Sequence, residues 1–378
     1  MIIFIKMLND FFETWKNANY SINLSNDWRR IVFYSEGPWI TKHLSPLIRE
    51  LVDNRNIKIT FLTSAKDDNF FIKNNKNLKK IYIGDTSART FLFRKLSIEL
   101  MVMSTPSLQS MQLKRQKESK YYYIHHSPMS THMIYQENAF DNFDGIFCVG
   151  PYHIKETRER ERKFSLKKKN LLKSGYCNFD DLINNKKVFK NDEILIASSW
   201  GDNSIVNTCL MELISKLTNL GFNVTFRPHY MSFKKDKKIL NNVISAFKER
   251  DNFKLDLNPD SSISINNSKI LITDWSGIAF EYFVLNNKPI LFVDTPPKIN
   301  NKNYNKLSEK PLEVTMRNEI GETLQISEIK NLDLILFQEK VKMASNKVLK
   351  SDEFISKNFF NIGRSVDVIC DQILELIK

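Results

Sequence analysis

The residues best suited to acid–base chemistry are histidines at the ends of apolar runs. His125 and His126 end the apolar run 121–124, and His229 follows a second apolar run together with Arg227. A neutral imidazole can accept a proton, and a guanidinium binds phosphate. Neighbouring side chains on a strand face opposite sides, so only one of the adjacent histidines is expected to point into a cleft. We predict that this residue is His126. The alternative interpretation is that His126 makes only a structural hydrogen bond, and its position at a strand end favours the functional one.

Residues 269–296 form a pattern that favours phosphate binding. The apolar run 270–272 reads as a strand, Ser276 and Gly277 lead into an apolar helical pattern, and 290–293 reads as a second strand. In a parallel strand–helix–strand unit, the first helical turn presents unpaired backbone N–H groups to an anion. The pattern therefore predicts a phosphate site at the start of this helix, although a serine in this position is also a common N-cap.

Several common catalytic motifs are missing from the sequence. It has no GxGxxG, P-loop, HExxH or GxSxG motif, so the usual nucleotide-binding signatures, zinc proteases and serine hydrolases are not indicated. It has no convincing DxD motif, and its four cysteines are widely spaced without a CxxC pair. We therefore predict no metal site, no disulfide framework and no cofactor.

The composition indicates a soluble protein with two domains. Of the 378 residues, 42% are apolar and 26% are charged, which is enough apolar material for two cores. The formal net charge of +13 favours polyanionic partners such as nucleic acid, anionic lipid or phosphorylated substrates. No aromatic–basic repeat or RNP-like motif is present, so we predict no nucleic-acid partner. No apolar run reaches the roughly 20 residues that cross a bilayer, and no signal-peptide pattern begins the chain, which favours the cytoplasm.

Strands and helices alternate along the chain, which predicts an α/β fold with parallel, doubly wound sheets. We predict a Rossmann-like domain at 1–183, a second at 184–350 that begins with the polar linker 184–192, and a C-terminal helix within 351–378 that packs back on the first. Ligands of such sheets bind at the carboxyl ends of the strands, so the two sheets are expected to face a central cleft. Strands are expected at 31–34, 57–62, 80–83, 99–103, 121–124, 145–149, 171–176, 193–197, 221–226, 270–272 and 290–293.

Two stretches have the composition of membrane-surface contacts. The first twenty residues combine apolar side chains such as Phe11 and Phe12 with Lys6 and Lys16, as in an interfacial helix, but a packed terminal helix fits equally well. The basic run 155–173 contains interspersed apolar residues and reads either as a solvated helix face or as a polyanion contact. We predict peripheral binding to an anionic membrane surface.

Five motifs in order resemble a known family. They are HHSP at 125–128, ASSW at 197–200, RPHY at 227–230, TDWSGIAFEY at 273–282 and KPILFVD at 288–294. This order resembles the CDP-glycerol glycerophosphotransferases of the teichoic-acid primase and polymerase type, whose patterns are WHGTP-like, APTW-like, RPHP-like and TDYSS..FDY-like, followed by KPIIF. The resemblance covers roughly 121–294, and its last two motifs are the most specific.

The resemblance implies a GT-B fold and transfer of a polyol phosphate from a CDP-activated donor, which is a substrate and not a cofactor. The acceptor is then a hydroxyl of a cell-surface glycan or its lipid-linked precursor, reached from the inner face of the membrane. By correspondence with the motifs, His126 assists deprotonation of this hydroxyl, His229 contacts the donor phosphates and Glu281 binds the ribose. The residues expected to bind the donor and its phosphates are Arg227, Ser198, Ser199, Trp200, Thr273, Asp274, Ser276 and Gly277.

The departures from the family patterns leave other activities open. Ser127 replaces a glycine, Ser198 and Ser199 replace Pro-Thr, and Gly277 replaces a serine. Another CDP-polyol or a nucleotide sugar is compatible with the same scaffold, because a fold does not by itself determine the substrate. The alternative enzyme is a GT-B glycosyltransferase of capsule or lipopolysaccharide synthesis. A further alternative is a non-catalytic protein that binds polyanions or membranes.

Overall fold

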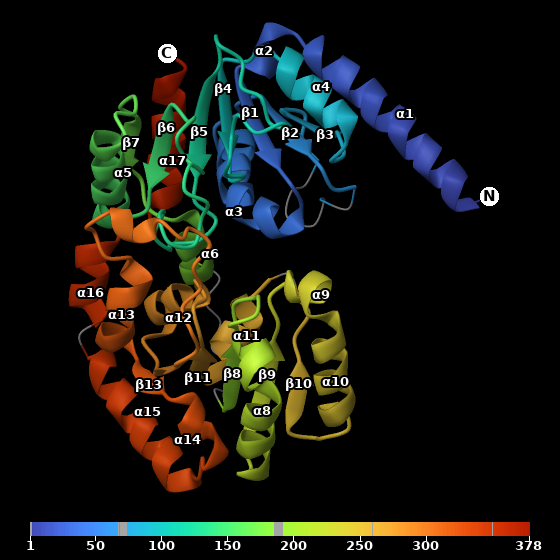
Figure 1. The fold of residues 1–378 in the computed structure, drawn as a ribbon. Coiled ribbons are helices and arrows are strands. Elements are labelled where there is room, and N and C mark those ends of the chain that lie inside the picture. The colour runs from blue at the N-terminus through green and yellow to red at the C-terminus, as the bar shows by residue number, and fades with distance from the viewer. Residues whose placement is uncertain (1, 67, 69–73, 185–191, 259, 350) are drawn as a thin grey trace. The chain divides into compact units, whose positions relative to one another are not determined.

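The computed structural model describes residues 2–66, 68, 74–184, 192–258, 260–349 and 351–378. The chain folds into two compact units (Figure 1). The first unit comprises 1–127, 135–180 and 359–378, and the second comprises 128–134 and 181–358. The last part of the chain therefore belongs to the unit in which the chain starts.

In the described part of the first unit, seven parallel strands form a sheet with the order β3-β2-β1-β4-β5-β6-β7. The central strand β1 (Ile31–Ser35) is buried along its whole length and pairs with β2 and β4. A strand covered on both faces needs apolar side chains on both, which explains the continuous apolar run that predicted it. The other strands are β2 (Ile59–Thr63), β3 (Leu78–Tyr82), β4 (Leu100–Met103), β5 (Lys120–Ile124), β6 (Gly145–Cys148) and β7 (Asn170–Lys173).

Helices cover both faces of this first sheet. Phe33 packs in a core cluster with Leu44 of α3 and Ile369 of α17, whereas the ring of the next residue, Tyr34, lies 5.0 Å from that of Phe93 in α4. Successive side chains of β1 thus reach opposite helical layers. The helices are α1 (Ile2–Ile22), α2 (Asn26–Arg29), α3 (Pro38–Arg49), the π-helix η1 (Glu50–Asn54), α4 (Ser87–Lys95), α5 (Pro151–Lys163) and α17 (Ser365–Leu376), with α6 (Cys177–Asn184) at the change of unit.

The second unit has the same architecture. Its described residues form a parallel sheet of six strands in the order β10-β9-β8-β11-β12-β13, and side chains such as Ile196 and Ile272 pack against Leu213 of α8. The strands are β8 (Glu193–Ala197), β9 (Asn223–Arg227), β10 (Phe253–Leu255), β11 (Ser268–Thr273), β12 (Ile290–Val293) and β13 (Glu322–Leu324).

The helices of the second unit connect and cover these strands. The segment 128–134 also belongs to the second unit. It is attached there by Ser130, whose backbone N–H and hydroxyl both donate to the buried carboxylate of Glu313. The helices are α7 (Ile205–Thr208), α8 (Leu210–Asn219), α9 (Ser232–Lys235), α10 (Lys237–Phe247), α11 (Ser262–Asn267), α12 (Ile278–Asn286), the 3-10 helix η2 (Tyr304–Lys306), α13 (Leu312–Ile320), α14 (Ile326–Lys330), α15 (Leu334–Val348) and α16 (Ser351–Asn358).

The predicted α/β class with parallel sheets is confirmed. The predicted strands correspond to observed ones, whereas β10 and β13 were not predicted because each has three residues and lies at a sheet edge. Of the C-terminal segment 351–378, α16 belongs to the second unit and α17 to the first. Most of the predicted linker, 185–191, lies outside the described residues. All four cysteines are buried, and none of them forms a disulfide.

Candidate active site

The first unit places His126 just beyond the end of β5, where it is half-buried. The preceding residue, His125, is 1% exposed and its ring stacks on that of His153 at 3.8 Å. Neither ring nitrogen of His125 has a hydrogen-bond partner among the described residues. The alternation of the strand thus sends one imidazole into the core and leaves the other more accessible.

The hydrogen bonds of His126 define which of its ring nitrogens carries the proton. Nδ1 lies 3.1 Å from the carbonyl oxygen of Ser104, which can only accept, so Nδ1–H donates to it. The neutral ring then has its lone pair on Nε2, 3.5 Å from the hydroxyl of Tyr135. Burial lowers the pKa of His126 to about 4, and the nearby charge of Lys42 adds a smaller decrease. The hydrogen bond to the Ser104 carbonyl acts in the opposite direction. At neutral pH this imidazole is therefore an unprotonated base.

A second histidine supports the loop that holds His126. The hydroxyl of Tyr176 donates to the carbonyl oxygen of His126 at 3.1 Å and lies 3.1 Å from Nδ1 of His43 in α3. His43 is buried, and burial holds the pKa of its imidazole well below the usual value. Its place in a buried hydrogen-bonded pair indicates that it positions the backbone of His126.

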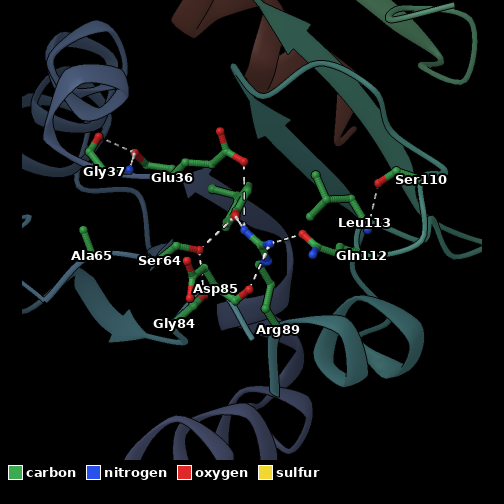
Figure 2. Close-up of polar contacts among 12 residues, drawn as sticks. Glu36, Gly37, Ser64, Ala65, Gly84, Asp85, Arg89, Ser110, Gln112 and Leu113 are labelled. Carbon is green, nitrogen blue, oxygen red and sulfur yellow. Dashed lines mark hydrogen bonds and ion pairs between the residues drawn. The ribbon is translucent and has the colours of Figure 1, made fainter. Parts of the chain in front are cut away.

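The carboxyl ends of β1, β2 and β3 and the loop after β4 meet around Arg89 of α4 (Figure 2). This buried guanidinium donates to the hydroxyl of Tyr34 at 3.0 Å, to the carbonyl oxygen of Asp85 at 3.2 Å and to the side-chain oxygen of Gln112. The carboxylate of Glu36 lies 3.9 Å from it. Arg89 therefore links several loops on the edge of the sheet that also bears His126.

In the second unit, the predicted residues Thr273 and Asp274 connect neighbouring strand ends. The hydroxyl of Thr273 donates to the carbonyl oxygen of Ala197 at 2.6 Å. The two carboxylate oxygens of Asp274 accept from the backbone N–H groups of Ser199 at 2.6 Å and Ile205 at 2.9 Å. Burial raises the pKa of Asp274, and these N–H donors oppose the rise. Both side chains thus shape the loop after β8, which contains the predicted residues Ser198, Ser199 and Trp200.

The start of α12 has the free groups that an anion site requires. Its N-cap position is Gly277, and no side chain caps it. Within the described residues, neither the hydroxyl of the half-buried Ser276 nor the backbone N–H groups of Gly277 and Ile278 have a hydrogen-bond acceptor in the protein. Ser276 is therefore not the helix cap that was the alternative interpretation, and its hydroxyl is available to a ligand.

The other predicted donor residues of the second unit make contacts within the fold. Arg227, at the end of β9, forms an ion pair with Asp256 at 2.8 Å. Nδ1 of His229 accepts from the N–H of Met231 at 3.1 Å, so a neutral His229 carries its proton on Nε2. Glu281 is buried in the first turn of α12.

Two cations near these loops were not predicted from the sequence. The buried guanidinium of Arg317 donates to the carbonyl oxygens of Asp274 and Val293 and lies 4.3 Å from the ring of Trp275. Burial lowers the pKa of Arg317 to about 10. Nζ of Lys298 lies 3.9 Å from the ring centre of Trp200. In the sequence, the feature that could have identified Lys298 is its position shortly after the apolar run 290–293.

Among the described residues, no group of three or more His, Cys, Asp or Glu side chains has a geometry suited to a metal ion.

Comparisons of the whole fold identify proteins with the same architecture. The wall teichoic acid polymerase TagF superposes with a TM-score of 0.63 at 14% identity, covering 99% of this chain and 97% of that chain. A variant of TagF soaked with CDPG superposes with a TM-score of 0.65 at 14% identity over the same shares. The Methanocaldococcus jannaschii UDP-GlcNAc 2-epimerase in complex with UDP-GlcNAc and UDP has a TM-score of 0.58 at 13% identity, covering 92% and 99%. No curated protein matches the chain by sequence.

The two Rossmann-like units with parallel sheets have the GT-B fold, as TagF does. The sequence model of the CDP-glycerol:poly(glycerophosphate) glycerophosphotransferases matches residues 18–296. The chain belongs to this family and is a glycerophosphotransferase that uses CDP-glycerol, as the motifs at 125–128, 227–230 and 273–282 predicted.

Proposed function

We propose that His126 is the general base of glycerol phosphate transfer from CDP-glycerol to a hydroxyl of a cell-surface glycan or its lipid-linked precursor. The acceptor oxygen attacks the phosphorus that bears glycerol, and its proton passes to Nε2 of His126. The bond from this phosphorus to the bridging oxygen breaks, and its electron pair remains on the departing CMP. The observation that carries this assignment is the neutral ring of His126, whose Nδ1–H is bound to the Ser104 carbonyl oxygen.

We also propose that the second unit binds the donor. The hydroxyl of Ser276, the N–H groups at the start of α12 and Nε2–H of His229 donate hydrogen bonds to the pyrophosphate oxygens. Glu281, in the first turn of the same helix, binds the ribose hydroxyls. Arg227, Thr273 and Asp274 act indirectly, by holding the loops after β8 and β9 in place.

Release of nucleotide from candidate donors tests this function. The purified protein is incubated with CDP-glycerol, CDP-ribitol, and UDP-, GDP- and CMP-linked sugars in the presence of a lipid-linked acceptor. We expect CMP from CDP-glycerol, with His126→Ala and His229→Ala each lowering kcat by about 100-fold or more, as for loss of a general base or a phosphate donor. Thermal unfolding of both variants serves as the control for folding. Release of UDP or GDP with no CMP from any CDP-polyol would instead favour the glycosyltransferase alternative.

We propose further that α1 binds an anionic membrane surface. Its first turns expose apolar side chains on several sides, with Phe12 65% exposed, and in Figure 1 this end of α1 extends beyond α4 and the sheet of the first unit. Lys66 pairs with Asp10 and Glu13, so the exposed Lys6 and Lys16 give this helix a positive surface. The described residues contain no helix long and apolar enough to span a bilayer. Exposed apolar side chains with flanking cations are typical of interfacial helices. The exposed apolar residues are Ile5, Met7, Leu8, Phe11 and Phe12.

The basic run 155–173 is a weaker candidate for the membrane contact. It forms the end of α5 and the strand β7, and several of its cations have carboxylate partners. Arg160 pairs with Asp141 at 2.7 Å, and Arg158 with Glu161 at 2.5 Å. Lys169 is 6% exposed. Cations neutralised within the fold contribute little attraction to anionic lipid.

Sedimentation with vesicles tests the role of α1. We expect binding to vesicles that contain phosphatidylglycerol and little binding to pure phosphatidylcholine. Replacing both Phe11 and Phe12 by Glu should abolish sedimentation. The matched control is Met111→Glu, because Met111 is an exposed apolar residue of the same unit outside α1. Unchanged sedimentation of the double variant would contradict the proposal.

A further inference from the structure

Three basic side chains from different loops surround the ring of Trp200 in the second unit. Nζ of Lys298, which follows β12, lies 3.9 Å from the ring centre, and Nζ of Lys235, in α9, lies 5.8 Å from it. The imidazole of His229, which follows β9, has its centre 6.3 Å from the same ring. Trp200 itself follows β8. The carboxyl ends of β8, β9 and β12, three strands of one parallel sheet, thus bring these groups together at the edge where ligands of such sheets bind.

Lys298 differs from two other half-buried cations of the second unit, Arg227 and Lys347, because it has no carboxylate partner among the described residues. Arg227 pairs with Asp256, and Lys347 pairs with Glu322 at 2.9 Å. In the described part of the chain, no carboxylate lies within ion-pair distance of Lys298, and no atom accepts a hydrogen bond from it. Two acids act on Lys298 through their charges. Asp274 accepts from two backbone N–H groups, whereas Asp236 accepts from the amide of Asn207 at 2.9 Å through Oδ1 and has no hydrogen-bond partner for Oδ2 among the described residues.

The contact with Trp200 does not compensate for the burial of this charge. A cation over an aromatic ring is stabilised only weakly, whereas removing an ammonium group from water has a larger free-energy cost. Consistent with this imbalance, burial lowers the pKa of Lys298 to about 8, although the charges of Asp274 and Asp236 act in the opposite direction. A cation kept in such a place is best explained by an anion that binds beside it.

Unpartnered hydroxyl groups lie on the same loops. The hydroxyls of Ser198, after β8, and Thr295, after β12, are buried and have no hydrogen-bond partner among the described residues. Ser198 is two residues from Trp200, and Thr295 is three residues from Lys298. Hydroxyl donors together with an ammonium group form a donor set suited to phosphate oxygens.

We propose that Lys298, assisted by Lys235, binds the phosphate groups of the nucleotide donor and neutralises the charge that develops on the departing CMP. This assignment rests on the proposed function. As the bond between phosphorus and the bridging oxygen breaks, CMP gains one negative charge beyond that of the diphosphate ester. An ammonium group fixed beside this oxygen stabilises the transition state more than the bound donor, so its loss lowers kcat as well as affinity.

Binding measurements with and without phosphate test this role. Calorimetry is carried out with CDP and with cytidine on the wild type, Lys298→Met, Lys298→Arg and the control Lys302→Met, which removes an exposed lysine four residues away. We expect Lys298→Met to weaken CDP binding about 10- to 100-fold, as for loss of one charge-assisted hydrogen bond, and to leave cytidine binding unchanged. Lys298→Arg should retain most of the CDP affinity, and Lys302→Met should match the wild type.

The outcomes separate this inference from the proposed function. Wild-type CDP affinity in Lys298→Met, or an equal loss of cytidine and CDP binding, would overturn the role of Lys298. If UDP bound in place of CDP with the same dependence on Lys298, the role of the lysine would stand and the proposed donor would be wrong. In turnover assays with CDP-glycerol, Lys298→Met should lower kcat and raise KM, whereas a residue that only maintained the fold would also lower the thermal unfolding temperature.

Discussion

The carboxylate of Asp274, at the end of β11, accepts a hydrogen bond of 2.6 Å from the backbone N–H of Ser199, in the loop after β8. Its second oxygen accepts from Ile205, at the start of α7. One side chain thus sets the path of the loop that contains Trp200. A residue of a site motif can thus position a neighbouring loop.

Replacing Asp274 by Asn should destabilise the second unit. An amide can accept from only one of the two N–H groups and presents its NH2 group to the other, which leaves a buried donor without an acceptor. We expect a loss of about 1–3 kcal/mol in the free energy of unfolding, measured by denaturant titration. Asp260→Asn, a change in a more exposed turn of the same unit, is the control. Wild-type stability of Asp274→Asn would show that these hydrogen bonds are unimportant.

The pH dependence of kcat/KM should reflect the low pKa of His126. Its imidazole has a pKa of about 4 in the free protein, below the ordinary 6.5, because burial and the Lys42 charge disfavour the protonated ring. The hydrogen bond to the Ser104 carbonyl favours the protonated ring but does not outweigh them. At CDP-glycerol concentrations well below KM, the reaction rate should therefore persist as the pH falls below 6.5 and decline only towards pH 4. An acidic limb centred near 6.5 would contradict the buried geometry.

The same shift predicts how stability changes with pH. A histidine whose pKa is lower in the folded state than in the unfolded chain contributes stability above pH 6.5, and that contribution is lost as the pH falls from 6.5 towards 4. For His126 the effect is of the order of 3 kcal/mol. Denaturant titrations of the wild type and His126→Gln at pH 7 and pH 5 measure it. The two proteins should differ in their pH dependence, and parallel curves would refute the assignment.

Ser276→Ala should separate ligand binding from folding. The hydroxyl of Ser276 has no partner in the described part of the protein, so the free energy of unfolding should change by less than about 0.5 kcal/mol. The loss of one hydrogen bond to a charged phosphate should raise KM for CDP-glycerol about tenfold. A large loss of stability with unchanged KM would show that this serine is structural after all.

Arg89→Met should affect the first unit through its loops. The buried guanidinium donates to Tyr34, Asp85 and Gln112, and its loss removes the hydrogen bonds that connect their loops (Figure 2). We expect unfolding to become easier by about 2–4 kcal/mol, as for other broken buried polar networks. Arg94→Met, in the same helix but exposed, is the matched control. Equal stability of the two variants would exclude a linking role for Arg89.

Local sequence determined most of the fold and the order of the site motifs. Strands such as β1 and β12 are covered on both faces and therefore need apolar residues at every position. This continuous apolar run makes them predictable from the sequence. The edge strands β10 and β13 are short and partly exposed, so their sequences lack this signal. The alternation of side chains along a strand likewise predicted that only one of His125 and His126 would point away from the core, and the structure shows that His125 is the buried one.

Only the tertiary structure decided how the site residues pair. Arg227 stands at a strand end in the sequence, but its partner Asp256 follows β10, which lies beside β9 only because of the strand order in the sheet. In the same way, the parallel register of the sheet carries Lys298 over Trp200, 98 residues earlier in the chain. Hydrophobic periodicity reports the burial of each segment, but it contains no information on which strand ends become neighbours. Contacts between side chains from different strands depend on that order, and so they appear only in the folded structure.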